Sequence, residues 1–72
     1  MNIEQGAFYR CSDGKIRRVL YPFNRKSQKW FECNVYDASG RFLHYYKFSE
    51  ANLKSLIVER VKPKNELRLA RY

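Results

Sequence analysis

Residues 6–23 read GAFYRCSDGKIRRVLYPF, and the Asp13-Gly14 pair near their centre decides the fold. Asp-Gly between two apolar runs is a strong signal for a tight hairpin turn, because both residues tolerate positive φ angles. The sequence therefore predicts one strand over 6–11 and a second over 15–23. Pro22 cannot donate a hydrogen bond to a neighbouring strand, so the far end of the second strand is expected at a sheet edge. Alternation places Val19, Tyr21 and Phe23 on one face of this strand, and Ile16, Arg18 and Leu20 on the other.

Two more strands are expected further along the chain. A polar, basic loop over 24–29 precedes a strand over 30–36, and a glycine-containing turn over 37–40 precedes a strand over 41–48. The core face of the 30–36 strand is expected from Phe31, Cys33 and Val35. In the 41–48 strand, alternation places Phe42, His44, Tyr46 and Phe48 on one face, and Leu43, Tyr45 and Lys47 on the other.

The segment after residue 48 fits two interpretations. Ser49 is a good helix N-cap, and Leu53, Leu56 and Ile57 follow helical spacing. The run 56–61 is also rich in β-branched residues, which suit a strand. We expect a short helical turn near 49–55 followed by a strand over 56–62. The alternative is an α+β fold with a four-stranded sheet and one helix over 50–61, and Pro63 ends either element.

These elements define a mainly β domain over residues 1–62, followed by a basic tail or extra strand over 63–72. The pattern Gly6-x-x-Tyr9-Arg10, Asp13-Gly14-Lys15 and Val19 resembles the opening of small bacterial and phage domains of the SH3-like barrel type. The resemblance covers residues 6–62 and implies a small antiparallel barrel or a curled sheet of four to five strands. That architecture hosts nucleic-acid binding, peptide binding and oligomer assembly alike, so it leaves the function open.

The charge distribution indicates an anionic partner. The 72 residues carry a net charge of +8, and residues 10–29 alone contain seven basic groups and one acid. A second basic block covers residues 53–72. Nucleic acid is the commonest partner of such a chain, ahead of a membrane surface or an acidic protein. We expect no membrane association, because no run of 18 apolar residues exists and a proline interrupts the basic C-terminal segment.

Catalytic and metal-binding residue patterns are missing from the sequence. Cys11, Cys33 and His44 are the only soft metal ligands and lack the spacing of a zinc site. The carboxylates form no recognisable pair, and no serine or cysteine has a base at a suitable spacing. We therefore expect no enzyme activity, no cofactor and no metal. The N-terminus lacks the features of a secretory signal, which predicts a cytoplasmic protein with reduced, buried cysteines.

Basic residues interleaved with aromatic ones make the candidate interface. Cations neutralise phosphates, and exposed rings stack on unpaired bases. Twelve aromatic residues exceed what one small interior holds, so we expect Trp30, Tyr36 and Tyr45 to face outward. The candidate nucleic-acid-binding residues are Arg10, Arg17, Arg18, Arg25, Lys26, Lys29, Trp30, Tyr36, Arg41, Tyr45 and Lys47. This predicts a non-enzymatic accessory or regulatory protein that binds DNA or RNA. The alternative is a protein-interaction module, a homo-oligomer or a small inhibitor protein.

Overall fold

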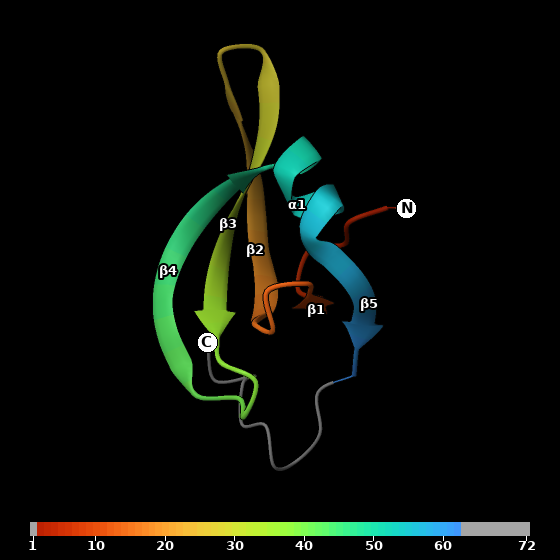
Figure 1. Cartoon of the computed structure of the whole chain (residues 1–72). Coiled ribbons are helices and arrows are strands. Elements are labelled where there is room, and N and C mark those ends of the chain that lie inside the picture. Colours follow the sequence, from red (N-terminus) through yellow and green to blue (C-terminus); the bar gives the residue numbers. More distant parts are fainter. Residues whose placement is uncertain (1, 63–72) are drawn as a thin grey trace.

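Five antiparallel strands form one curled sheet in the computed structural model, which describes residues 2–62 (Figure 1). The elements in chain order are β1 (Phe8–Cys11), β2 (Ile16–Arg25), β3 (Gln28–Tyr36), β4 (Phe42–Ser49), α1 (Glu50–Leu56) and β5 (Ile57–Val61). The strand order is β4-β3-β2-β1-β5, so β4 and β5 are the two outer strands and the sheet stays open. The predicted mainly β class is confirmed, in its curled-sheet form. The prediction for 63–72 lies outside the described residues.

The Asp13-Gly14 turn joins β1 to β2 as predicted. Gly14 has a φ of 84°, and the Asp13 carboxylate accepts a hydrogen bond from the Lys15 backbone N–H at 3.1 Å. The Cys11 and Lys15 backbones close the turn with an N–H···O bond of 2.9 Å. This geometry explains why the Asp-Gly signal is reliable: a positive φ falls on glycine, which has no Cβ to clash.

The hairpin between β2 and β3 is longer than expected. The predicted loop over 24–29 is wrong, because pairing continues through Asn24↔Lys29 and Arg25↔Gln28. Only Lys26 and Ser27 form the turn, with φ angles of 52° and 65°. Positive φ at both central positions matches the right-handed twist of a two-residue hairpin. β1 pairs with β2 only over residues 16–18, so within the described part of the chain the Pro22 end of β2 has no partner on that side, as predicted.

Two register shifts change which side chains share a face. One lies between Val19 and Tyr21, and it pairs Tyr21 with Glu32 on the face opposite Val19. The other bypasses Leu43, so Phe42 pairs with Tyr36 while His44 pairs with Val35. The expected grouping of Val19 with Tyr21 and Phe23 is therefore wrong, as is that of Phe42 with His44, Tyr46 and Phe48. Bulges insert one residue into a strand and reverse the alternation beyond it.

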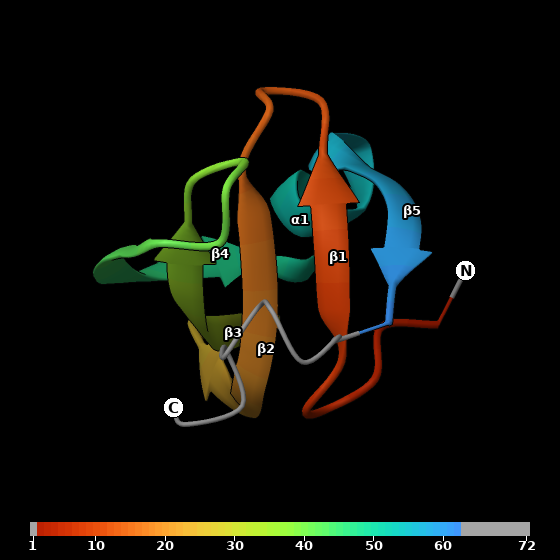
Figure 2. The same ribbon diagram turned by 90° about the horizontal axis from the view of Figure 1, so that it is seen from below.

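The main core lies between the sheet and α1. Figure 2 shows α1 on the far side of β1 and β2, with β1 lying between β2 and β5. Leu53 is the buried residue of α1, and the Ser49 side chain caps the helix by accepting from the Asn52 N–H at 3.1 Å. The core cluster consists of Ala7, Tyr9, Cys11, Val19, Phe31, Cys33, Leu53 and Ile57. The helix-then-strand prediction for 49–62 is confirmed to within one residue, and a helix to 61 is excluded.

A second, smaller cluster occupies the opposite face of the sheet. Phe8, Ile16 and Tyr36 are buried there, with Phe42 and Val61 packed beside them. The Tyr36 ring lies 6.1 Å from Phe8 and 5.8 Å from Phe42, measured between centroids. Tyr36 is only 1% exposed, so the expectation that it faces outward is wrong. Its face is apolar because three neighbouring strands each contribute a large side chain to it.

Candidate nucleic-acid interface

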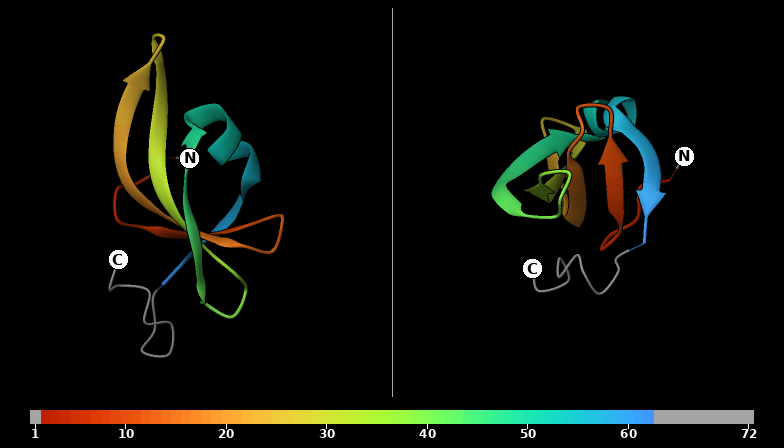
Figure 3. Two further views of the ribbon diagram at one scale, coloured as in Figure 1. Left: turned by 90° about the vertical axis from the view of Figure 1, so that its left-hand side faces the viewer. Right: turned by 60° about the horizontal axis from the view of Figure 1, so that its bottom comes forward.

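The β2–β3 hairpin forms an arm that stands beyond the rest of the sheet (Figures 1 and 3). Arg25, Lys26 and Lys29 lie at its tip, all exposed, and residues 14–31 contain no acid. Phe23 and Trp30 stack at 6.4 Å with an interplanar angle of 27°, and the Arg25 guanidinium lies 5.5 Å from the Trp30 ring centroid. The arm therefore presents concentrated positive charge on a frame stiffened by two rings.

A groove of about 470 Å³ opens where the arm, β4 and α1 meet. Arg25 and Lys47 give it two cations, and Asn52 and Ser55 of α1 give it polar groups. The full lining is Arg25, Trp30, Tyr46, Lys47, Phe48, Asn52, Ser55 and Leu56. A smaller hollow beside it is lined by Arg25, Lys26, Gln28 and Trp30, and extends the basic surface to the arm's tip.

Three rings follow one another along β4 on the groove side. His44 and Tyr46 meet at 6.3 Å with an interplanar angle of 88°, and Tyr46 and Phe48 meet at 5.2 Å with an angle of 68°. Phe48 packs against the main core, whereas Tyr46 is 57% exposed. The row thus runs from a core-anchored ring to an accessible one.

Arg17 packs against Phe48, the ring at the core end of this row. Its guanidinium lies 4.6 Å from the Phe48 ring centroid and is buried, with the residue 6% exposed. Two hydrogen bonds join it to the Asp13 carboxylate, at 2.9 and 3.2 Å. The hydrogen bonds from Arg17 lower the pKa of Asp13 to about 2. The expectation that Arg17 offers its charge to a ligand is therefore wrong, because that charge is buried and paired.

Other candidate cations lie away from the groove. Arg10 is paired with Glu59 at 2.7 Å, and Arg41 lies 3.8 Å from the Asp37 carboxylate. Arg18 donates to the Gly6 carbonyl at 3.4 Å and lies over the Phe8 ring at 5.1 Å. The basic block 10–29 therefore does not form one surface: the arm keeps three of its cations together, and the rest are distributed over the sheet.

The three rings expected to face outward have different environments. Trp30 is half-buried, and its Nε1 is buried without an acceptor in the part of the chain that the structure describes. Tyr36 is buried, as described above. Tyr45 is 57% exposed as predicted, but it lies on the face opposite Tyr46, 5.2 Å from Phe42. Tyr21 and Tyr46 are also exposed, and they were not among the rings expected to face outward.

The cysteines and acids offer no metal site among residues 2–62. Cys11 and Cys33 are both buried and free. Burial raises the pKa of Cys33 to about 12 and also raises that of Cys11. Both groups are therefore protonated thiols, and a thiol is a far weaker nucleophile and ligand than a thiolate.

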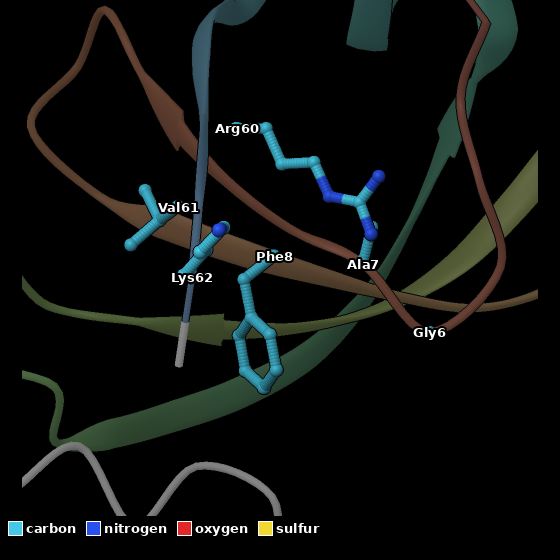
Figure 4. A pocket seen from close by; sticks show the side chains of 6 residues that line it. All are labelled: Gly6, Ala7, Phe8, Arg60, Val61 and Lys62. Carbon is cyan, nitrogen blue, oxygen red and sulfur yellow. The ribbon is translucent and has the colours of Figure 1, made fainter. Parts of the chain in front are cut away.

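A second hollow, of about 370 Å³, lies between the start of β1 and the end of β5 (Figure 4). Its lining is Gly6, Ala7, Phe8, Arg60, Val61 and Lys62. The Arg60 side chain extends across it toward Ala7, and its guanidinium pairs with Glu4 at 2.9 Å. That ion pair offsets the charge of Arg60, one of the two cations that line this hollow, and the hollow has no exposed aromatic ring in its lining.

No protein-family profile, curated protein or solved structure matches this chain. The resemblance to SH3-like barrel domains therefore stays a prediction. Among the described residues, α1 is the one helix, and it is too short to cross a membrane.

Proposed function

We propose that the protein binds nucleic acid without catalysing a reaction, through the arm and the groove at its base. The observation that carries this proposal is the position of Arg25 and Lys47 on a groove that also holds the exposed ring of Tyr46. Lys26 and Lys29 extend the positive surface along the arm. A polyanion with flat aromatic groups matches such a surface in both charge and shape.

The binding energy would come mainly from phosphate neutralisation. Each phosphate contact with Arg or Lys releases condensed counterions, which makes the affinity fall as salt rises. Asn52 lines the groove from α1 and supplies a side-chain amide donor for phosphate or sugar oxygens, whereas the Ser55 hydroxyl beside it donates to the Asn52 backbone carbonyl at 2.7 Å. The core-anchored row on β4 fixes the groove wall before a ligand arrives, so little ordering entropy is lost on binding.

Titration with labelled random DNA and RNA tests the proposal. We expect binding at about 50 mM salt that weakens steeply by about 200 mM, as counterion release requires. Log affinity falls with log salt, so this plot has a negative slope. The triple variant Arg25→Gln, Lys26→Gln and Lys29→Gln should make the slope shallower by about 2 to 3 units, since each lost phosphate contact removes roughly 0.7 to 0.9.

The matched control removes three charges elsewhere: Arg10→Gln, Arg41→Gln and Arg60→Gln. Each of these cations lies away from the groove beside an acid, and the control has the same net charge as the arm variant. We expect the control to retain most of the salt slope. Equal losses in both variants would show that net charge alone drives binding, and the absence of binding at low salt would refute the proposal.

The outer strand β4 supports a second candidate function, as a protein-interaction module. This strand has eight residues and exposed Leu43, Tyr45 and Tyr46, and no strand of residues 2–62 pairs with its outer side. An unpaired strand edge can add a strand from another chain, as in a homodimer or an inhibitor complex. Sedimentation equilibrium distinguishes the two candidate functions: a stable dimer that dissociates when β4 is substituted favours the protein-interaction module.

A cytoplasmic location stays a prediction.

A further inference from the structure

Resting on the proposed function, we infer that the groove selects single-stranded nucleic acid and that Tyr46 is the platform on which an unpaired base stacks. The nucleic-acid proposal itself requires only phosphate contacts, which duplexes and single strands both offer. The arrangement of rings and cations around the groove carries the further step.

The Tyr46 ring has the accessibility that stacking needs. It is 57% exposed, and its two described ring neighbours meet it at 88° and 68°, so neither is stacked parallel to it. A base can therefore take the stacked position, as bases do on the aromatic residues of single-strand binding proteins. Phe48, whose ring centroid lies 5.2 Å from that of Tyr46, packs against the main core.

Two cations line the same groove as the exposed ring of Tyr46. Arg25 comes from the arm, and Lys47 directly follows Tyr46 on β4, yet all three residues line one groove. Asn52 and Ser55 line it from α1, one helical turn apart, which places them on the same helix face. A backbone tracking this groove thus meets positive charge and hydrogen-bonding groups around an exposed ring.

Duplex DNA could use the arm differently. A two-stranded ribbon fits the major groove, and the arm is such a ribbon with Arg25 and Gln28 near its tip. In that mode bases stay stacked within the duplex, and Tyr46 at the base of the arm has no base to contact. The ring row and the groove favour the single-strand mode, in which both are used.

Trp30 provides a direct readout, since it is the only tryptophan and it lines the groove. We would titrate the full chain with an oligothymidine of about 12 nucleotides, within the range of known single-strand site sizes, and with a duplex of equal length. The expected result is quenching of Trp30 fluorescence and tighter binding of the single strand.

Tyr46→Ala and Tyr45→Ala form a matched pair, because both tyrosines are 57% exposed on opposite faces of β4. We expect Tyr46→Ala to lose about 5- to 150-fold in single-strand affinity, the range that stacking of one base supports. Its salt slope and duplex affinity should be unchanged. Tyr45→Ala should bind the single strand like the parent chain, and Tyr46→Phe should retain the stacking and the affinity.

Two outcomes would separate the inference from the function on which it rests. Equal or tighter duplex binding, or equal effects of Tyr45→Ala and Tyr46→Ala, would overturn single-strand stacking and leave phosphate binding intact. Failure of the parent chain to bind either oligonucleotide at low salt would overturn both. Near-ultraviolet circular dichroism of each variant establishes that an affinity loss does not come from unfolding.

Discussion

Arg17 joins the first hairpin to the core through one buried guanidinium. It lies over Phe48 at 4.6 Å and donates two hydrogen bonds to Asp13 in the β1–β2 turn. Burying a charge is unfavourable unless it is paired and hydrogen-bonded, so Asp13 is required to keep this residue in place. The pair stabilises the turn and the groove wall together, which gives a structural role to a residue whose type suggests ligand binding.

Asp13→Asn should therefore destabilise the protein. Removing one partner of a buried charge costs several kcal/mol, and the partial exposure of Asp13 reduces this to about 2 kcal/mol. The pKa of Asp13 is lowered to about 2 in the folded state, against about 4 in the unfolded chain. Its contribution is fully present above the unfolded pKa and is lost as the pH falls through about 2.

Urea denaturation at about pH 7, 4 and 2 measures both effects, because linkage ties stability to proton uptake. The parent chain should lose a component of its unfolding free energy between the two lower pH values that the Asp13→Asn variant lacks. Parallel pH profiles for the two proteins, or an unchanged midpoint at neutral pH, would contradict the assigned role of the Asp13–Arg17 pair.

At the scale of elements, the arm depends on an unusual turn. Lys26 and Ser27 both have positive φ angles, a conformation that costs a residue with a Cβ roughly 1 to 2 kcal/mol. Such cost is tolerated where the surrounding structure holds the backbone in place. Here the paired strands on both sides of the turn and the Phe23–Trp30 stack provide that restraint.

Ser27→Gly should stabilise the arm by up to about 1 kcal/mol, because glycine adopts positive φ without steric cost. The substitution leaves every arm cation in place, so nucleic-acid affinity should remain within twofold of the parent chain. Thermal unfolding and the fluorescence titration measure the two quantities. A lower melting temperature would show that Ser27 makes a favourable contact that outweighs its backbone strain.

Most strands, the first turn and the helix were predictable from the sequence because each has a local signal, whereas the turn at Lys26 and Ser27 contains no glycine or asparagine to indicate it. Asp13-Gly14 predicted the first turn, and Ser49 predicted the start of α1. The shifts at Leu20 and Leu43 had no such signal, because a bulged apolar residue looks like any other strand residue. The second shift puts Phe42 and Tyr46 on opposite faces, whereas unbroken alternation placed them on one face.

The burial of Tyr36 and Arg17 could not be predicted from the local sequence pattern, for a different reason. Alternation implies one buried face per strand, but this small sheet buries apolar clusters on both faces. Tyr36 belongs to the second cluster. Arg17 is buried beside the first cluster, where it pairs with Asp13 and lies over the Phe48 ring. Which strand covers which face depends on sheet curvature, a property of the whole fold.

At the scale of the molecule, the fold pairs some cations with acids and leaves others grouped on the arm. Ion pairs with Glu59, Asp13 and Glu4 each take up one cation of the sheet body. Residues 14–31, which include the tip of the arm, contain no acid, so Arg25, Lys26 and Lys29 stand apart from these pairs. The field is therefore expected to be strongest at the arm end, and it should orient an approaching polyanion toward the groove.

The most direct test maps the contact surface by heteronuclear NMR of the isotope-labelled chain during titration with oligothymidine. The account predicts that amide shifts concentrate in residues 23–30, 46–48 and 52–56, the segments that form the arm and the groove. Shifts confined to the opposite end of the molecule, around Arg10 and Arg60, would contradict it.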